Sequence, residues 1–350
     1  MFTPPSKAII FRVEAGEQIG MGHLMRCISL AQAAHQVNIE AIFFVSKATF
    51  ELANKLNTFT FKLHLIDHLT SDIESQLLEQ ITSEYKVLHY VLDGYQFSLT
   101  YRTQLKQQLM QHSIPLVILD DNGGEQHGDL VAADIVVNPT CADGHVPDYA
   151  RLVPQAKVYA GNQYRLLRNE FVEQAPNDFE KRHGIVVTMG GSDPLNYSQS
   201  CLEVLHQLNI NLPVTCLIAG GFSHKNALIS FIKQLPDNFC YLYQPGNIAS
   251  IFAEAKFAIS AAGGTQFELY AMHTPAILLV SFNNQWRNSQ STEAQGWAKV
   301  LDFRHRFDKS ALTDSILQLL QTDKRRQMYL SIKPGLAQGA ERLIEALSLN

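Results

Sequence analysis

Short apolar runs alternate with amphipathic stretches along the whole chain, and this alternation constrains the fold more than any other feature. In the first half the apolar runs cover residues 8–13, 41–45, 62–66, 87–93, 116–120 and 134–139. Helical periodicity lies between them, as in residues 22–35, 71–83 and 99–112. Strands separated by helices form parallel sheets, and unbroken apolarity is typical of strands buried on both faces. The pattern predicts a doubly wound α/β domain with strands of this kind.

The same pattern starts again in the second half. Its apolar runs cover residues 184–191, 214–221, 240–244, 257–264 and 276–280, and three of them end in a glycine pair. A polar, proline-containing segment separates the halves, and 350 residues at about 150 per domain suit two domains. We predict Rossmann-like domains over residues 1–172 and 184–335, a linker over 173–183 and a closing helix over 336–350. Ligands bind at the carboxyl ends of such sheets, so we expect the domains to face a central cleft.

Composition and charge exclude several classes of protein. The net charge of −5 gives no general attraction to nucleic acid or to anionic membranes, so any anion site must be local. The longest apolar stretch, around Pro275 to Val280, is far too short to span a bilayer, and the N-terminus has no secretory pattern. We therefore expect a cytoplasmic protein without nucleic-acid partner or stable membrane association, and a monomer.

The five cysteines are scattered and form no Cys-x-x-Cys pair. Three of them, Cys27, Cys216 and Cys240, lie in strand-like or helical segments. Buried free thiols in a reducing compartment are the expected state, and a zinc site is not indicated. No spaced set of other metal ligands stands out, so we predict neither metal nor cofactor.

Several common catalytic motifs are missing from the sequence. There is no phosphate-binding Gly-x-x-x-x-Gly-Lys-Ser/Thr loop and no Gly-x-Ser-x-Gly nucleophile elbow. The glycines of "GEQIGMGHLMR" do not have the dinucleotide spacing Gly-x-Gly-x-x-Gly either. An ATPase, a serine hydrolase and a dinucleotide-dependent enzyme are thus not supported.

The first strand is followed by a glycine loop, Gly20-Met21-Gly22, and then by His23 and Arg26. We expect His23 in the first turn of a helix, where the helix dipole favours a neutral imidazole that can accept a proton. Arg26, three residues on, shares roughly the same helix face. Two interpretations are open: a base and a cation beside an anionic substrate, or a tight turn with polar surface residues.

Two glycine pairs of the second half are predicted to bind a diphosphate. Gly190, Gly191 and Ser192 follow one strand, and Gly263, Gly264 and Thr265 follow another, so their backbone N–H groups could donate to phosphate oxygens. Glu268, one helical turn further, could accept hydrogen bonds from ribose hydroxyls. The alternative is structural: Thr265 and Glu268 have capping-box spacing, and Asp193-Pro194 suits a helix start with Pro194 at its first position.

Polar side chains also follow other predicted strands. Asp93 and Tyr95 end one first-half strand, and Asp120 and Asp121 end the next. Substrate contacts gather at such strand ends, although turn formation explains these acids equally well. In the second half "SFNNQW" places amide side chains after a strand, where they could bind sugar groups or begin a helix.

Taken in order, these segments resemble those of a known family, the UDP-2,4-diacetamido-2,4,6-trideoxy-β-L-altropyranose hydrolases of pseudaminic acid biosynthesis. The resemblance covers nearly the whole chain. It rests on "IGMGHLMRCISLA", "VLDGYQF", "LDDNG", "ADIVVNPT", "GNQYRLLRNEF", "VVTMGGSDPLN", "SAAGGTQFELYAMHTPAIL" and "GAERLI". Glu14 stands where the family usually has an aspartate.

The resemblance implies a GT-B architecture and a nucleotide-sugar hydrolase that needs no metal. It implies that UDP lies in the second domain, near residues 190–192 and 263–268, with the sugar toward the first domain. His23 would orient the attacking water, with Tyr95 and Asn284 around the sugar, near the loop of Gly22 and Arg26. Anomeric carbon–oxygen cleavage with inversion is implied.

Two other functions remain open from the sequence. A GT-B glycosyltransferase would hand the sugar of a UDP-sugar donor to an acceptor, and many such enzymes dock on membranes through a basic, aromatic patch that is not evident here. A non-catalytic protein that binds nucleotide sugars would tolerate any residue at His23.

Overall fold

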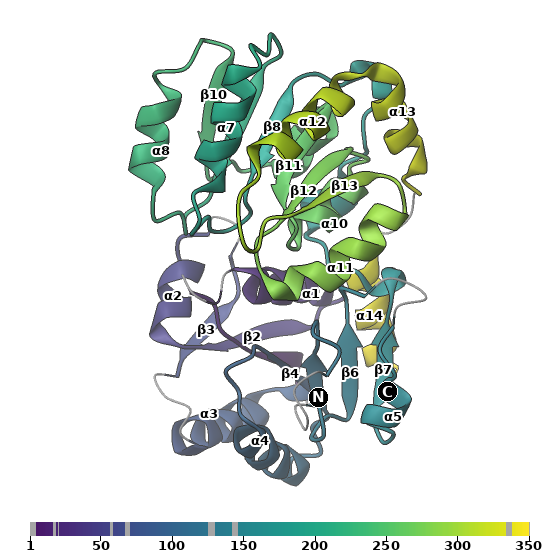
Figure 1. The fold of residues 1–350 in the computed structure, drawn as a ribbon. Coiled ribbons are helices and arrows are strands. Elements are labelled where there is room, and N and C mark those ends of the chain that lie inside the picture. The colour runs from purple at the N-terminus through teal and green to yellow at the C-terminus, as the bar shows by residue number, and fades with distance from the viewer. Residues whose placement is uncertain are drawn as a thin grey trace. The chain divides into compact units, whose positions relative to one another are not determined.

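The chain forms two compact units in a computed structural model, which describes residues 5–16, 19, 21–56, 59–66, 71–124, 130–141, 146–333 and 338–349 (Figure 1). The first unit holds Met1–Ile19, His23–Asn169 and Ala337–Asn350, and the second holds Gly20–Gly22 and Glu170–Leu336. The domain limits predicted from the sequence stay a prediction, as does the cleft.

The first unit is built on a parallel sheet. Its described strands are β1 (Lys7–Val13), β2 (Glu40–Val45), β3 (Lys62–Leu65), β4 (Lys86–Asp93), β5 (Leu116–Leu119), β6 (Ile135–Asn138) and β7 (Lys157–Ala160). They lie in the order β3-β2-β1-β4-β5-β6-β7. Its described helices are α1 (Gly22–Gln36), α2 (Lys47–Ala53), α3 (Ser71–Glu84), α4 (Leu99–Gln111), α5 (Tyr149–Leu152), the short 3-10 helix η1 (Asn162–Tyr164) and α14 (Gly339–Ser348).

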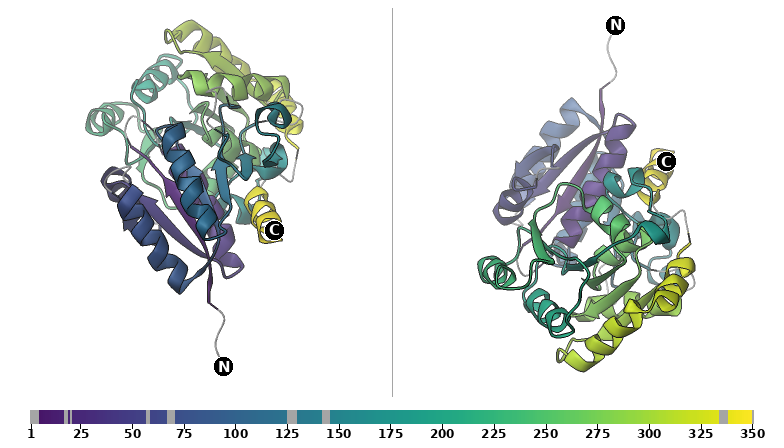
Figure 2. Two further views of the ribbon diagram at one scale, coloured as in Figure 1. Left: turned by 90° about the horizontal axis from the view of Figure 1, so that it is seen from below. Right: turned by 90° about the horizontal axis from the view of Figure 1, so that it is seen from above.

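One face of this sheet packs against α3 and α4. Ile10 and Phe44 of the sheet share a buried cluster with Leu78 of α3 and with Leu105 of α4. These two helices lie side by side in Figures 1 and 2. Because every residue of β1 after Lys7 is buried, Arg12 included, the strand is covered on both faces, as its mainly apolar sequence predicted.

The second unit repeats the plan with a second parallel sheet. Its described strands are β8 (Ile185–Thr188), β9 (Val214–Ile218), β10 (Phe239–Tyr243), β11 (Phe257–Ala261), β12 (Ala276–Val280) and β13 (Ala298–Asp302), in the order β10-β9-β8-β11-β12-β13. Its described helices are α6 (Asn169–Glu173, which begins at the border), the 3-10 helix η2 (Phe179–Lys181), α7 (Tyr197–Gln207), α8 (Lys225–Ile232), α9 (Ile248–Glu254), α10 (Thr265–Ala271), α11 (Asn283–Ala294), α12 (Lys309–Leu320) and α13 (Thr322–Ser331). The prediction of two doubly wound α/β domains is confirmed.

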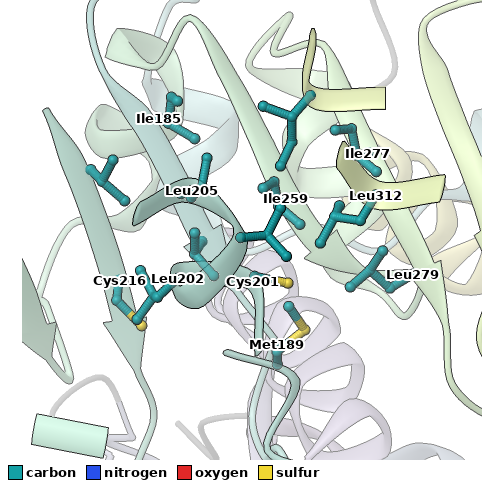
Figure 3. Packing of buried hydrophobic residues seen from close by; sticks show 14 of the residues in the cluster. Ile185, Met189, Cys201, Leu202, Leu205, Cys216, Ile259, Ile277, Leu279 and Leu312 are labelled. Carbon is teal, nitrogen blue, oxygen red and sulfur yellow. The ribbon is translucent and has the colours of Figure 1, made fainter. Parts of the chain in front are cut away.

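Helices α7, α8 and α12 supply the apolar layer on one face of this second sheet. Figure 3 shows Leu202 and Leu205 of α7 and Leu312 of α12 among the strand residues Ile259 and Ile277. All five side chains are buried, so this layer fixes the sheet and hence the loops at its carboxyl edge.

The structure corrects some predictions about single elements. Most residues of the edge strands β3 and β10 are exposed or half-buried, so the prediction of strands buried on both faces was wrong there. Cys240 on β10 is exposed rather than buried, because an edge strand leaves one side uncovered, while the other four cysteines are buried and all five are free. None of the helices in the described ranges has the length and apolarity needed to cross a bilayer.

Candidate active site

His23 is the second residue of α1, the helix that follows β1. As predicted it lies in the first helical turn, after Gly22, and its side chain is buried. Gly20 of the preceding loop lies outside the described residues. Strand β1 pairs with β4 at the point where the strand order reverses, and the register sets Val13 beside Asp93. The carboxyl end of β4 therefore lies next to the start of α1.

Asp93 is fully buried and holds the His23 ring. Its Oδ1 lies 2.7 Å from His23 Nδ1. Burial by itself would raise the pKa of Asp93, but Arg26 and His23 lower it to about 2. A carboxylate that stays ionised accepts hydrogen bonds and cannot donate one, so the ring proton belongs on Nδ1. Nε2 is then the nitrogen that can accept a proton, as in a histidine oriented by an aspartate.

Arg26 binds two carboxylates with its guanidinium group. Nε donates to Asp93 Oδ2 at 2.6 Å, Nη2 donates to Asp93 Oδ1, and Nη1 donates to Asp121 Oδ2 at 2.8 Å. Burial would lower the pKa of Arg26, but Asp93 and Asp121 raise it well above its usual value. In this structure Arg26 thus contacts protein carboxylates, and its predicted contact with substrate stays a prediction.

Tyr95 closes the arrangement from the loop after β4. Its hydroxyl donates to Asp121 Oδ1 at 2.6 Å, and its ring meets the His23 ring edge to face, with centroids 4.7 Å apart. Tyr95 is 41% exposed, whereas the His23 ring behind it is 5% exposed. Tyr95 is therefore exposed to solvent while its hydroxyl is hydrogen-bonded to Asp121.

These side chains line a pocket within the first unit. It is bounded by His23, Arg26, Gly94, Tyr95, Arg102, Ile118, Leu119, Asp120, Asp121, Asn122 and Leu130. Asp120 accepts a hydrogen bond from Tyr149, whose hydroxyl also accepts one from Asn138 Nδ2 at 2.7 Å. Burial raises the pKa of Asp120. The pocket is small, and both hydrogen-bond donors and acceptors line it.

Glu14 stands at the end of β1 and anchors the chain that leads toward His23. Its Oε2 accepts a hydrogen bond from Thr49 at 2.6 Å and another from Ser46, and its Oε1 accepts one from Arg12 at 2.5 Å. Thr49 in turn accepts from the backbone N–H of Ala15 at 2.8 Å. Glu14 therefore has a structural role in this loop.

In the second unit the two glycine loops lie at the corresponding reversal of strand order, between β8 and β11. Gly190 has a φ of +72°, and a methyl group placed on it would lie 3.4 Å from Thr265 Oγ1. The structure thus brings the loop of Gly190, Gly191 and Ser192 against that of Gly263, Gly264 and Thr265. Both loops follow neighbouring strands, β8 and β11, at the carboxyl edge of this sheet.

The predicted helix starts next to these loops are partly wrong. Helix α10 begins at Thr265 itself with Gly264 as N-cap, and no side chain caps it, so the capping box of Thr265 and Glu268 is not formed. Glu268 lies in the first turn of α10. Pro194 does not begin α7 either, because this helix starts at Tyr197 and Asp193 accepts from its backbone N–H at 2.9 Å.

The amide residues after β12 lie at the start of α11, as the structural alternative predicted. Asn283 is its first residue, and its Oδ1 accepts a hydrogen bond from Arg304 Nη1 at 2.9 Å. Asn284 is the second residue, and its side chain lies outside the described part of the structure. Within the described residues, histidine, cysteine and carboxylate side chains form no group of three suited to a metal ion.

Comparison with known proteins supplies independent information. No family model matches the chain. It is 25% identical over 274 residues to the UDP-2,4-diacetamido-2,4,6-trideoxy-beta-L-altropyranose hydrolase of Campylobacter jejuni, which covers 73% of this chain and 85% of that one. It is 22% identical over 280 residues to the pseudaminic acid cytidylyltransferase and UDP-2,4-diacetamido-2,4,6-trideoxy-beta-L-altropyranose hydrolase of Helicobacter pylori, covering 79% of this chain and 45% of that protein.

Solved structures identify the fold. MurG of Acinetobacter baumannii matches with a TM-score of 0.64 at 14% identity, over 99% of this chain and 100% of that one. A UDP-glucosyltransferase from Polygonum tinctorium matches with a TM-score of 0.68 at 12% identity, over the full length of both. The chain is thus similar in sequence to the UDP-2,4-diacetamido-2,4,6-trideoxy-β-L-altropyranose hydrolases, as its motifs predicted, and it has the GT-B-like fold.

Proposed function

We propose that this chain hydrolyses UDP-2,4-diacetamido-2,4,6-trideoxy-β-L-altropyranose, or a close isomer, to free sugar and UDP, a step toward pseudaminic acid. The observation that carries the proposal is the pair of Asp93 and His23 at a polar pocket, in a chain similar to two proteins named for this hydrolysis. Stated more generally, the chain is an enzyme that acts on a UDP-sugar.

The chemistry needs one base and one stabilised leaving group. With its proton on Nδ1 facing Asp93, His23 accepts a proton from water at Nε2. The water oxygen bonds to the anomeric carbon as the carbon–oxygen bond to the diphosphate breaks, and the electron pair leaves with UDP. Attack on the ring face opposite the leaving group inverts the anomeric configuration.

The leaving group needs hydrogen-bond donors more than an acid, because a diphosphate departs as a stable anion. We assign this role to the backbone N–H groups of residues 190–192 and 263–265, which lie together at the carboxyl edge of the second sheet. Glu268 would bind the ribose hydroxyls. Tyr95 and Asn284 would contact the sugar.

The experiment determines which product takes up the oxygen atom of water. The purified chain is incubated with the UDP-sugar in oxygen-18 water, without an acceptor and with a chelator, and products are analysed by mass spectrometry. We expect UDP without label and free sugar with one labelled oxygen. Label in UDP would mean attack at phosphorus and would overturn the role of His23.

A matched pair of variants on one helix tests the base. His23→Ala should lose turnover by about 100-fold or more, the usual range for general-base catalysis, while His35→Ala at the far end of α1 should keep it. If both variants turn over normally, the base lies elsewhere.

A second candidate is a glycosyltransferase that uses a UDP-sugar donor, since solved structures with this fold include a UDP-glucosyltransferase from Polygonum tinctorium. It predicts that UDP release requires an acceptor. Rapid UDP release in buffer alone excludes it, and a panel of 6-deoxy diacetamido isomers then identifies the sugar.

A further inference from the structure

We propose that Arg26 is a positioning residue, which acts on the reaction through Asp93, His23 and Tyr95 and not by contact with the substrate. Only the kinetic test of this inference rests on the proposed function. It replaces the sequence-based expectation that Arg26 serves as a cation beside an anionic substrate.

The first reason is geometric. Nε and Nη2 of Arg26 occupy both oxygens of Asp93, so the carboxylate cannot rotate without breaking a charge-assisted hydrogen bond. This fork fixes Oδ1 where it meets His23 Nδ1 at 2.7 Å. Nη2 also lies 2.9 Å from His23 Nδ1, but neither an arginine nor a protonated ring nitrogen can accept, so this contact is not a hydrogen bond.

The Nη1 group of Arg26 acts on Tyr95 through Asp121. Nη1 binds Asp121 Oδ2, and the other oxygen of Asp121 accepts from the Tyr95 hydroxyl at 2.6 Å. The tyrosine ring then meets His23 edge to face. The five side chains form a closed ring, in which Arg26 is the one member bonded to both carboxylates.

The third reason is charge balance. Among the described residues, the groups that face the pair of Asp93 and His23 come from four places: Arg26 and Cys27 on α1, Tyr95 after β4, Asp120 and Asp121 after β5, and Arg102 on α4. Of the two cations among them, Arg26 is the one bonded to Asp93. An isolated buried carboxylate would favour imidazolium, which cannot accept a proton from water. Arg26 offsets part of the negative charge of Asp93, so removing Arg26 should make imidazolium more favourable.

The ring can be tested without turnover. Selectively nitrogen-15-labelled histidine reports, by NMR, the tautomer and the pH at which His23 takes up its proton, with His23→Gln assigning the signals. We expect the Nδ1–H tautomer in the unchanged protein. In Arg26→Met, His23 should take up its proton at a pH higher by about 1 to 3 units. The reason is that the negative charge of Asp93, no longer offset by Arg26, then stabilises the imidazolium.

The matched control is Arg165→Met. Arg165 is also a buried arginine of the first unit, and it donates to Pro139 O and to Asn162 Oδ1, both at 2.8 Å. Its loss should lower stability and leave the His23 titration unchanged. Arg26→Lys, which keeps the charge and loses the fork, should shift the titration less than Arg26→Met and serves if the latter does not fold. An unchanged titration in folded Arg26→Met would overturn the proposal, and so would an unchanged titration together with an unchanged tautomer of His23 in Arg26→Lys.

Kinetics then separates positioning from substrate contact. If Arg26 acts through His23, Arg26→Met should lower kcat at pH 7 by about tenfold or more, but by less than about twofold in the His23→Ala background. A full loss in both backgrounds, or an effect on KM alone, would mean that Arg26 contacts the substrate. If the unchanged protein has no hydrolase activity, the proposed function fails, and the NMR result still decides the role of Arg26.

Discussion

Replacing Asp93 by asparagine tests the geometry of the site most directly. In the present structure Oδ1 accepts from Arg26 Nη2 and His23 Nδ1, while Oδ2 accepts from Arg26 Nε. An asparagine must place an NH₂ group in one of these two positions. An NH₂ group in the position of Oδ2 would face the Nε–H of Arg26, so that two hydrogen-bond donors would meet without an acceptor. At Oδ1 it would face His23 and favour the tautomer with its proton on Nε2, which cannot accept a proton from water.

The size of the effect follows from either outcome. Each arrangement loses at least one charge-assisted hydrogen bond, worth about 1.5–3 kcal/mol. If that energy is needed to restore the productive tautomer, kcat falls by about 10- to 150-fold. Asp93 is fully buried and cannot touch a substrate, so KM should stay within about twofold of the original value.

The assay measures UDP release from the UDP-sugar at pH 7 under saturating and limiting conditions. Asp134→Asn is the control, because Asp134 is an aspartate of the same unit that pairs with Lys106 away from the pocket. Circular dichroism shows whether both variants are folded. A folded Asp93→Asn whose kcat lies within threefold of the unchanged enzyme would refute the assignment of Asp93 as the residue that orients His23.

Three further predictions concern stability and binding. The pKa of Asp93 is about 2 in the folded chain against 3.8 ordinarily, so Asp93 contributes ~2 kcal/mol above about pH 4 that is lost as the pH falls toward 2. Urea unfolding at pH 6 and pH 3 should show a smaller acid loss in Asp93→Asn, and an equal loss would contradict the low pKa. Gly339→Ala places a methyl group 2.1 Å from Arg165 O and should destabilise the chain by about 1–3 kcal/mol, seen as a lower Tm, whereas Gly246→Ala has open space and should not. Gly190→Ala, at a φ of +72°, should cost about 1–2 kcal/mol in its loop and weaken UDP binding measured by calorimetry; unchanged affinity would remove this loop from the nucleotide site.

Secondary structure was predictable from the sequence where strands are buried on both faces. The runs that became β1, β5 and β12 are almost wholly apolar, and burial keeps them so. Strands β7 and β13 were not predicted. Both lie at sheet edges, where exposed Lys157 begins β7 and exposed Lys299 interrupts β13, so neither segment is a continuous apolar run.

The site was predictable only in part. The glycine loop identified His23, and the strand-end pattern identified Asp93, Tyr95 and Asp121. What the sequence could not supply was that β1 and β4 are neighbours, since 70 residues separate His23 from Asp93. Pairing order decides which strand ends meet, so the ring around Arg26 became visible only in the structure.

Helix α14 has a consequence for how the chain is made. It belongs to the first unit, where Gly339 packs against the backbone of Arg165, yet it follows the whole second unit in the sequence. During synthesis from the N-terminus, the second unit can complete its core while the first still lacks a helix. We therefore expect a nascent chain stalled before residue 339 to expose the surface around Arg165 to chaperones and proteases.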